Sequence, residues 1–480
     1  MTKDLRTFLQ EWEEKSPGDI LRIDKEISAN YEVTALQWKL GALGKYPIII
    51  CEKPLKVDGT PSEYPLVVNL TANRYICAEV IGIRPDRVAA EYNRRMAEAR
   101  VAPVVISKDQ APVKEVIKSG EKVNLWEFPV VTHHVLDPGP YITAGYVTTY
   151  DPDTGISNTA LQRCQVKGRN KTGFYADSHS HNARNVRKFW EANQDVPVAV
   201  WIGHHPAALI GGQQRLGHPE SHYPSMGGLL GEPLRIVPTE TFGDKLMVPA
   251  DAELVIEGYI PKHTYEAEGP FGEYTGYVGP QRPSFLINVT CVTHRRNAYY
   301  QDIAVGQPDT LIVSNFPMEA RVYEVVRQVC PDVTNVHIPL SAHRFHCYVQ
   351  VKKTRAGVGK EVILAALPCD IRIKHVIVVD EDIDIFDDKQ VLWAIGSRTQ
   401  WNRDVYILPD LPMSALDPSL SAPGTYGCRG GIDATKPLPL GPGLPNHFAQ
   451  VNRVPSEVME KIRVEDFVEE SKLRAFRGTF

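Results

Sequence analysis

Hydrophobic residues in the first 110 positions predict a mixed α/β region. Leu5, Leu9 and Trp12 recur at the spacing of a short amphipathic helix. Residues 84–100 mix acidic and basic side chains around apolar positions at helical spacing, which predicts a surface helix. Mostly apolar runs predict strands at 20–23, 47–51 and 65–70, and the run at 47–51 predicts a buried one.

The pattern changes to short strands between about 115 and 305. Gly/Pro-rich turns separate the segments, and residues 151–155 (DPDTG) form a strong turn signal between two strands. Many short strands with frequent turns favour a barrel or a sandwich. The apolar runs predict strands at 146–150, 198–202, 254–258 and 285–290.

From about 306 the α/β pattern returns. We predict helices at 317–329 and 390–397 and strands at 345–352 and 375–380. The Pro/Gly-rich stretch 438–445 indicates a linker or crossing arm. Behind it, residues 456–473 are amphipathic and predict a terminal helix that docks on a neighbouring subunit. These changes divide the chain into three predicted domains, 1–114, 115–305 and 306–480.

Composition and charge exclude several classes of protein function. The 480 residues carry 53 Lys+Arg against 58 Asp+Glu, a net charge of −5, which disfavours binding to nucleic acid or to an anionic membrane. No apolar run approaches the roughly 20 residues of a membrane helix. The eight cysteines form no CxxC pair and indicate reduced thiols. Acidic residues occupy the place of a signal peptide's apolar stretch. We therefore expect a cytoplasmic protein, an enzyme by its general character.

Histidines are unevenly distributed. Eight of the 15 fall between His133 and His222, several of them as close pairs. One interpretation is a metal or proton-transfer site in the β-rich domain. The alternative is that these side chains satisfy buried carbonyls or lie on loops.

The segment 268–273 (EGPFGE) holds two glutamates five positions apart. The Gly-Pro and Phe-Gly steps favour a turn over a helix. Glu268 and Glu273 can then converge on one pocket, where an apolar neighbour favours a carboxyl group that acts as a general acid. The alternative is a surface turn with two solvated glutamates.

Residues 157–163 (SNTALQR) place Asn158 and Arg163 on one extended segment after a tight turn. In a pocket, an arginine can bind a carboxylate or phosphate through two hydrogen bonds. The alternative is an ion pair at a sheet edge.

Taken together, several motifs resemble the UbiD family of reversible (de)carboxylases that use prenylated FMN. The resemblance runs in order over nearly the whole chain, and the string EGPFGEYTGY is its most specific part. The motifs occupy residues 125–134, 140–145, 151–163, 268–277 and 379–384.

The resemblance implies a split β-barrel flavin-binding domain at 115–305 between two α/β domains. It also implies catalytic roles for Arg163, Glu268 and Glu273, with Arg163 and Glu268 paired beside the flavin and Glu273 as the proton donor. The implied cofactor-binding residues are Asn158, Thr159, Ala160, Leu161, Gln162, Arg163, Ser180, His181 and Gln214.

Family members bind one divalent ion, usually manganese, with potassium nearby. By resemblance, Asn158 and His181 are two of the metal ligands, and such O and N donors suit this type of ion. The sequence departs from the family at the third ligand. His222 stands where a glutamate is expected, while Glu220 lies two residues earlier. Either His222 replaces the carboxylate or Glu220 serves after a local shift.

The resemblance also indicates the substrate pocket. Ser314, Arg372, Leu411 and Met413 fall close to positions that line it. Arg372 would bind a polar ring substituent or a second carboxylate, which favours an aromatic or heteroaromatic acid. The alternative is a salt bridge between Arg372 and Asp370.

The predicted reaction is non-oxidative loss of CO₂ from such an acid, with the prenylated flavin as electron sink. A flavin prenyltransferase would supply the cofactor, and we expect a homodimer or homohexamer. Three other interpretations remain: a conventional FMN-dependent oxidoreductase on a related β-barrel, a non-catalytic partner subunit and a metal hydrolase.

Overall fold

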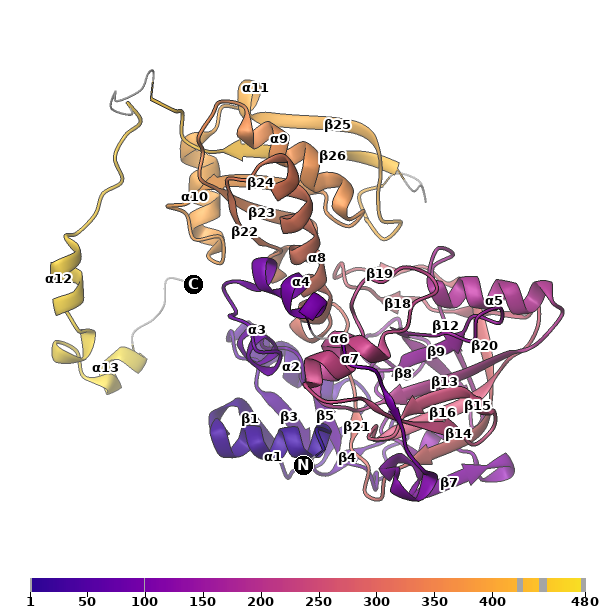
Figure 1. Cartoon of the computed structure of the whole chain (residues 1–480). Helices are drawn as coiled ribbons and strands as arrows, with labels where there is room; N and C mark the ends of the chain where they lie inside the picture. Colours follow the sequence, from indigo (N-terminus) through magenta and orange to yellow (C-terminus); the bar gives the residue numbers. More distant parts are fainter. Residues whose placement is uncertain (1, 99, 421–425, 440–446, 476–480) are drawn as a thin grey trace. The chain divides into compact units, whose positions relative to one another are not determined.

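The computed structural model describes residues 2–98, 100–420, 426–439 and 447–475. It separates into two compact units, residues 1–435 and 436–480. The mixed α/β class is confirmed, and Figure 1 shows helices and sheets alternating along the first unit.

The N-terminal part has a four-stranded sheet in the order β1-β3-β5-β21. Parallel pairing joins β1 to β3 and β5 to β21, while β3 and β5 are antiparallel. Its main strands are β1 (Ile20–Ile23), β3 (Ile48–Cys51), β5 (Leu66–Val68) and β21 (Tyr300–Gln301), beside the short pair β2 (Ile27–Ser28) and β4 (Pro54–Leu55). The helices are α1 (Leu5–Lys15), α2 (Glu32–Ala42), α3 (Arg74–Val80) and α4 (Val88–Glu98).

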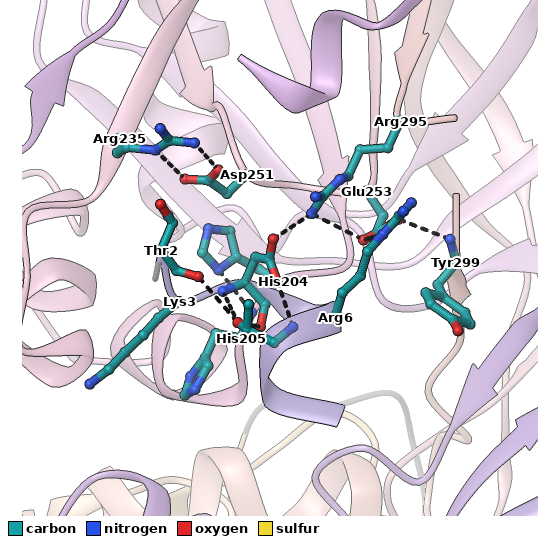
Figure 2. A network of polar contacts seen from close by, with 12 residues as sticks. Thr2, Lys3, Arg6, His204, His205, Arg235, Asp251, Glu253, Arg295 and Tyr299 are labelled. Carbon is teal, nitrogen blue, oxygen red and sulfur yellow. Dashed lines mark hydrogen bonds and ion pairs between the residues drawn. The ribbon is translucent and has the colours of Figure 1, made fainter. Parts of the chain in front are cut away.

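Helix α1 is held by apolar packing on one side and by ion pairs on the other. Leu5, Phe8, Leu9 and Trp12 are buried, as the spacing predicted. Arg6 donates to both carboxylate oxygens of Glu253 at 3.0 Å (Figure 2). Arg295 donates to Asp4 at 2.7 Å. These contacts connect α1 to segments some 250 to 290 positions away.

The central part is a ten-stranded sheet in the order β10-β9-β13-β16-β20-β12-β11-β8, with β7 and β17 also paired to β20. Within the described residues, no pairing joins β10 to β8, the two ends of this order. Its strands are β7 (Val116–Ser119), β8 (Tyr141–Ile142), β9 (Tyr146–Tyr150), β10 (Ser157–Leu161), β11 (Cys164–Gly168), β12 (Lys171–Phe174), β13 (Val196–Ile202), β16 (Leu254–Ile260), β17 (Tyr265–Glu268) and β20 (Arg282–His294).

Smaller elements complete this region. Strands β15, β14 and β6 form a three-stranded sheet, and β18 and β19 form a hairpin. Their bounds are β6 (Val104–Val105), β14 (Arg235–Thr239), β15 (Gly243–Pro249), β18 (Phe271–Gly272) and β19 (Val278–Gly279), and the helices are α5 (His181–Glu191), α6 (Pro206–Gly211) and α7 (Tyr223–Leu230).

The C-terminal part of the first unit is a five-stranded sheet in the order β22-β23-β24-β26-β25. Strands β23, β24 and β26 run parallel, and the outer pairs are antiparallel. The elements are α8 (Pro308–Val329), β22 (Val333–His337), β23 (His346–Val351), α9 (Val358–Ala366), β24 (His375–Asp380), α10 (Asp388–Arg398), α11 (Trp401–Asp404), β25 (Val405–Pro412) and β26 (Tyr426–Ala434).

Two predicted helices differ from the structure. The helix predicted from residue 317 begins at Pro308, and Pro317 lies inside it. Proline suits the first turn of a helix, so either proline was a reasonable start and the sequence alone favoured the wrong one. The helix predicted over 456–473 is wrong in its continuity, because α12 (Ser456–Lys461) and α13 (Glu470–Ala475) are separate. Ile462 and Arg463 between them have extended backbone.

Positions 440–445 of the predicted linker lie outside the described residues. All eight cysteines are free, seven of them buried and Cys428 exposed. Among the described residues, no helix combines the length and apolar character needed to cross a bilayer.

Candidate active site

Arg163 lies between two glutamates that are more than a hundred positions away in the chain. Its Nε and Nη2 donate to the two oxygens of Glu268 at 2.8 and 3.0 Å. Its Nη1 donates to Glu273 at 2.7 Å. The residue stands in the connection between β10 and β11, directly after Gln162, whose amide donates to the Gly145 carbonyl at 2.9 Å. One guanidinium therefore organises both carboxylates of the EGPFGE segment.

The two glutamates have different surroundings. Glu268 ends β17, its side chain is fully buried, and Ser284 Oγ lies 3.5 Å from it. Glu273 follows β18, and 11% of its side chain is exposed. A Cβ at Gly279 on the opposite strand β19 would come within 2.8 Å of the Glu273 side chain, so glycine permits this close packing. The interpretation of a solvated surface turn is therefore wrong.

Electrostatics favour a charged Arg163. Burial by itself lowers the pKa of Arg163, but hydrogen bonding to Glu268 and the charge of Glu273 outweigh it, and the net pKa is raised. The guanidinium carbon also lies 4.9 Å from the centre of the Phe271 ring, a cation–π contact. Arg163 is thus a buried, fixed positive charge and not an arginine at an exposed sheet edge.

Two cavities adjoin this site. The first, which we call the Met413 cavity, has a volume of about 760 Å³ and is lined by Tyr175, Ser178, Ser284, Met413 and Ser414, among others. The second, the His133 cavity, has a volume of about 610 Å³ and is lined by Trp38, His133, His134, Glu273 and Gln307, among others. Both volumes fall in the range of small-molecule sites, roughly 300–1,000 Å³.

The segment from Asn158 to Gln162 meets the start of α5 through Asn182, a residue that the sequence analysis missed. Asn158 Nδ2 donates to Asn182 Oδ1 at 2.7 Å, and Asn182 Nδ2 donates to Gln162 Oε1 at 2.8 Å. Ser180 caps the same helix by accepting from the Ala183 amide at 3.3 Å. Asn158, Gln162 and Ser180 are therefore brought together. The position of Asn182 directly after His181 was the only sequence feature that could have indicated its role.

The other predicted cofactor-binding residues have different surroundings. The Thr159 hydroxyl contacts Thr148 at 2.8 Å and accepts from the Trp201 indole at 3.2 Å, so its side chain belongs to the core. Ala160 and Leu161 are half-buried. Gln214 accepts from Ser225 through its side chain and from His222 through its backbone carbonyl.

The predicted metal ligands lie in one region, since His181 and Glu220 both influence the pKa of His222 and Asn158 bonds the residue after His181. Burial and, to a smaller extent, the nearby His181 lower the pKa of His222 to about 4, although the hydrogen bond to Gln214 and the charge of Glu220 oppose this shift. Its Nε2 donates to the Gln214 carbonyl at 3.0 Å, while its Nδ1 is buried without a hydrogen-bond partner. Glu220 is instead engaged near the surface by the Gly217 amide at 3.0 Å and by Arg100 at 3.3 Å.

Within the part of the chain that the structure describes, no group of three His, Cys, Asp or Glu side chains has a metal-binding arrangement. The histidines that lie close together in the sequence make separate contacts in the structure. His133 bonds the buried Asp302 at 2.9 Å, and His218 contacts Asn185 at 3.1 Å.

The predicted substrate residues meet around Tyr274, which directly follows Glu273. The Tyr274 hydroxyl donates to Ser414 at 3.0 Å, next to Met413 in the cavity wall. On its other side, the Arg344 guanidinium lies 5.1 Å from the ring centre and donates to Ser314. The sequence analysis missed Tyr274 and Arg344. Tyr274 lies within the resemblance motif at 268–277, whereas Arg344 carries no local signal.

Two of the predicted substrate-pocket residues, Arg372 and Leu411, make contacts within the protein. Arg372 forms the salt bridge with Asp370 through two bonds of 2.8 Å, which was the alternative interpretation. Leu411 packs against the apolar core of the C-terminal part.

Comparisons with known proteins identify the family of this chain. Three parts of the chain match the domains described as 3-octaprenyl-4-hydroxybenzoate carboxy-lyase N-terminal domain (13–96), Rift-related domain (104–308) and C-terminal domain (312–434). Among curated proteins, a phenolic acid decarboxylase of Sedimentibacter hydroxybenzoicus is 30% identical over 456 residues, covering 92% of this chain and 93% of its own length. An anhydromevalonate phosphate decarboxylase of Methanothermobacter thermautotrophicus is 30% identical over 441 residues, with 90% and 97% covered.

A solved structure of the UbiD-class enzyme HmfF from Pelotomaculum thermopropionicum in complex with FMN superposes with a TM-score of 0.87. It is 34% identical and covers 97% of this chain and 100% of its own. An evolved dimeric form of HmfF in complex with prenylated FMN has a TM-score of 0.85 at 32% identity, with 97% and 100% covered.

Proposed function

Because this chain belongs to the UbiD family of carboxy-lyases, we propose that it is a reversible, non-oxidative decarboxylase that uses prenylated FMN. The proposed substrate is an aromatic or heteroaromatic, α,β-unsaturated carboxylic acid. The observation that carries the proposal is Arg163 held between Glu268 and Glu273, with Glu273 in the wall of the His133 cavity.

The residues present fit a flavin cofactor. The Met413 cavity has a volume of about 760 Å³, and Ser178 and His179 in its wall directly precede Ser180, which lies with Asn158 and Gln162 at the start of α5. When bound, the prenylated flavin supplies an electron sink for the bond pair that remains when CO₂ leaves. The prenylated FMN in the HmfF structure supports this assignment.

The protein's own part in the reaction is positioning and proton transfer. Arg163 fixes both carboxyl groups and excludes their free rotation. We assign the proton donor to Glu273, because Glu268 is fully buried and receives two hydrogen bonds from Arg163. Glu273 receives one such bond and lines an open cavity. It donates its proton to the carbon that has lost CO₂ and regains a proton from solvent.

We further propose a divalent ion, manganese by family resemblance, with Asn158, His181 and His222 as ligands and potassium nearby. The His222 geometry fits this role, since Nε2 donates to a backbone carbonyl and the unpartnered Nδ1 is left as the donor atom. The engagement of Glu220 by Arg100 disfavours the alternative ligand. His222→Ala should reduce bound metal about 10–100-fold by elemental analysis. An equal loss in Glu220→Ala, with full retention in His222→Ala, would reverse the assignment.

We propose a homodimer or homohexamer that receives its cofactor from a flavin prenyltransferase. The described residues 447–475 expose many apolar side chains: Val451, Val454, Val458, Met459, Ile462, Val464 and Phe467. Such a set on a small segment is typical of an interface. The free thiols support a reducing compartment, and we place the protein in the cytoplasm.

The first experiment is the absorption spectrum and extracted-cofactor mass of protein produced together with a flavin prenyltransferase. A prenyl-sized mass increase over FMN and CO₂ release from aromatic or heteroaromatic acids are the expected results. Glu273→Gln should keep the spectrum and lose about 10²–10⁴-fold in turnover, the usual contribution of a positioned general acid. Unmodified FMN with hydride-transfer activity would instead support the oxidoreductase.

A further inference from the structure

The imidazole of His134 packs directly against the segment that carries Glu273. Gly272, the last residue of β18, precedes Glu273, and a Cβ atom at Gly272 would lie only 2.3 Å from Nδ1 of His134. Glycine at this position permits the close approach of the ring. The Gly272 amide donates to Asp137 Oδ1 at 3.3 Å, and the His134 amide donates to Asp137 Oδ2 at 2.8 Å. One carboxylate therefore holds the histidine and the β18 segment together.

The two ring nitrogens of His134 have different surroundings. Nδ1 is buried and lies 3.5 Å from Oδ2 of Asp137, whose side chain is fully buried. Nε2 makes no hydrogen bond to any of the described residues, and 17% of the His134 side chain is exposed. Asp137 thus fixes the position of the ring, and Nε2 is the nitrogen that is left to exchange a proton with solvent.

His134 and Glu273 line the same cavity, the His133 cavity of about 610 Å³. Trp38 and Tyr277 in its wall are exposed, so the cavity is open to solvent. Arg163 donates to Oε1 of Glu273, whereas Oε2 accepts no hydrogen bond from the described residues. A cavity of this size holds water molecules, which bridge polar groups that are not in direct contact. The arrangement connects solvent, His134 and Oε2 of Glu273.

The proposed reaction creates a need for such a connection. Glu273 gives one proton to the carbon in each turnover and must regain one before the next. Its neighbours Arg163 and Glu268 are poor sources, because burial is outweighed by the two glutamates, so that the pKa of Arg163 is raised, and Glu268 is fully buried. Histidine is the side chain best suited to gain and lose a proton near neutral pH.

We infer that His134 is a proton relay that returns a proton from solvent to Glu273 across the His133 cavity. In each cycle an N–H bond at Nε2 of His134 breaks and an O–H bond at Oε2 of Glu273 forms, with water between them. Solvent then restores the proton on Nε2, and no electron is transferred. His134 acts through Glu273, so it is a positioning residue. The inference rests on the proposed decarboxylase function.

Two other histidines in the cavity wall are less suited to this role. His133 is bonded through Nε2 to Asp302 at 2.9 Å, and its side chain has no exposed surface. Nδ1 of His343 is bonded to the Tyr274 carbonyl at 2.9 Å. Because His343 shares the cavity but not the contact with Asp137, it provides the matched control.

The test measures CO₂ release by the loaded enzyme in a buffer that contains no imidazole. Furan-2-carboxylate, pyrrole-2-carboxylate and 4-hydroxybenzoate serve as substrates. His134→Ala should lower kcat about tenfold or more and leave KM unchanged, because proton return follows substrate binding and chemistry. Imidazole added to the buffer should restore kcat, since it enters the space left by the ring and carries the proton. The flavin absorbance should remain that of wild type.

His134→Gln is the second variant, which fills the space with a polar side chain that does not titrate. It should show the same fall in kcat with less recovery in imidazole, and it serves if the alanine variant does not fold. His343→Gln is the control and should keep the kcat of wild type, with no response to imidazole.

Three results would overturn the relay while CO₂ release by wild type still supported the function. The first is a wild-type kcat in both His134 variants, and the second is a loss in His134→Ala that imidazole does not restore. The third is an imidazole-dependent loss in His343→Gln in place of His134→Ala. Loss of flavin absorbance in both His134 variants would assign the residue a structural role and also overturn the relay. If wild type releases no CO₂ from any acid, the proposed function fails and the relay fails with it.

Discussion

Two groups of buried charges in this protein differ in their balance. At helix α1, Arg6 and Arg295 face Asp4 and Glu253, two positive groups against two negative ones, all joined by contacts of 2.7 to 3.4 Å (Figure 2). Around Asp370, three arginines face one carboxylate. We call these the α1 network and the Asp370 cluster.

The difference concerns which charges the folded chain compensates. In the α1 network every charge has a partner, and the contacts connect segments that are remote in the chain. The Asp370 cluster leaves Arg344 without a partner, next to Tyr274 and the Met413 cavity. A balanced cluster has its charges compensated within the folded chain, whereas Arg344 has no ion pair among the described residues.

The Arg163 site has the opposite imbalance, with one positive group and two carboxyl groups. In the proposed reaction Glu273, one of these two groups, is the proton donor.

The largest expected effect tests the balanced network. Glu253→Gln removes the fully buried partner of both Arg6 and Arg295 and should lower the free energy of unfolding by about 3–5 kcal/mol in urea titrations. Glu13→Gln, which breaks an exposed pair with Arg22, is the control and should cost less than about 1 kcal/mol. Similar losses in the two variants would show that burial of the network adds no stability.

A second balanced cluster, formed by Glu319, Arg74 and His337, should make the stability of the protein depend on pH, with an effect of intermediate size. Glu319 is fully buried, and although burial raises its pKa, Arg74 and His337 outweigh this and lower the pKa from 4.5 to about 2. The stabilisation is therefore present above about pH 4.5 and is lost as the pH falls toward 2, a total of about 3 kcal/mol.

Urea unfolding of wild type and Glu319→Gln at a series of pH values measures this dependence. The stability difference between the two proteins should shrink steadily from pH 5 to pH 3. A constant difference over this interval would mean that Glu319 contributes no proton linkage.

The smallest expected effect sharpens the view of the Asp370 cluster. Arg215 is 38% exposed and bonded to Asp370, so it contributes only a screened charge. Arg215→Gln should lower the free energy of unfolding by less than about 1 kcal/mol in urea titrations, because Asp370 keeps its two bonds to Arg372. A loss as large as that of Glu253→Gln would show that Asp370 depends on Arg215.

Local structure was largely predictable from the sequence. The strands at 20–23, 146–150 and 375–380 have the predicted bounds, because runs rich in β-branched, aromatic and other apolar residues favour extended backbone over a few positions. The errors occur where two local signals compete, as at Pro308 and Pro317, or where a weak helix lacks packing, as at 456–473.

The site was predictable only in part. The motif residues Arg163, Glu268 and Glu273 were identified together through family resemblance, and the structure adds that Arg163 bonds both glutamates. Arg344 and Asn182 escaped notice because their importance depends on partners in other elements. The role of Glu273 remains to be tested by the variants above.

The sequence by itself determined the family, the elements and the residue types available for chemistry, because these depend on local pattern and on motif order. Only the tertiary structure decided which charges find a partner. Asp370 neutralises Arg372 and not Arg344, and Arg100 engages Glu220 while Nδ1 of His222 stays unpartnered. Ion pairing depends on distances between segments that are far apart in the chain, and no local pattern encodes those distances.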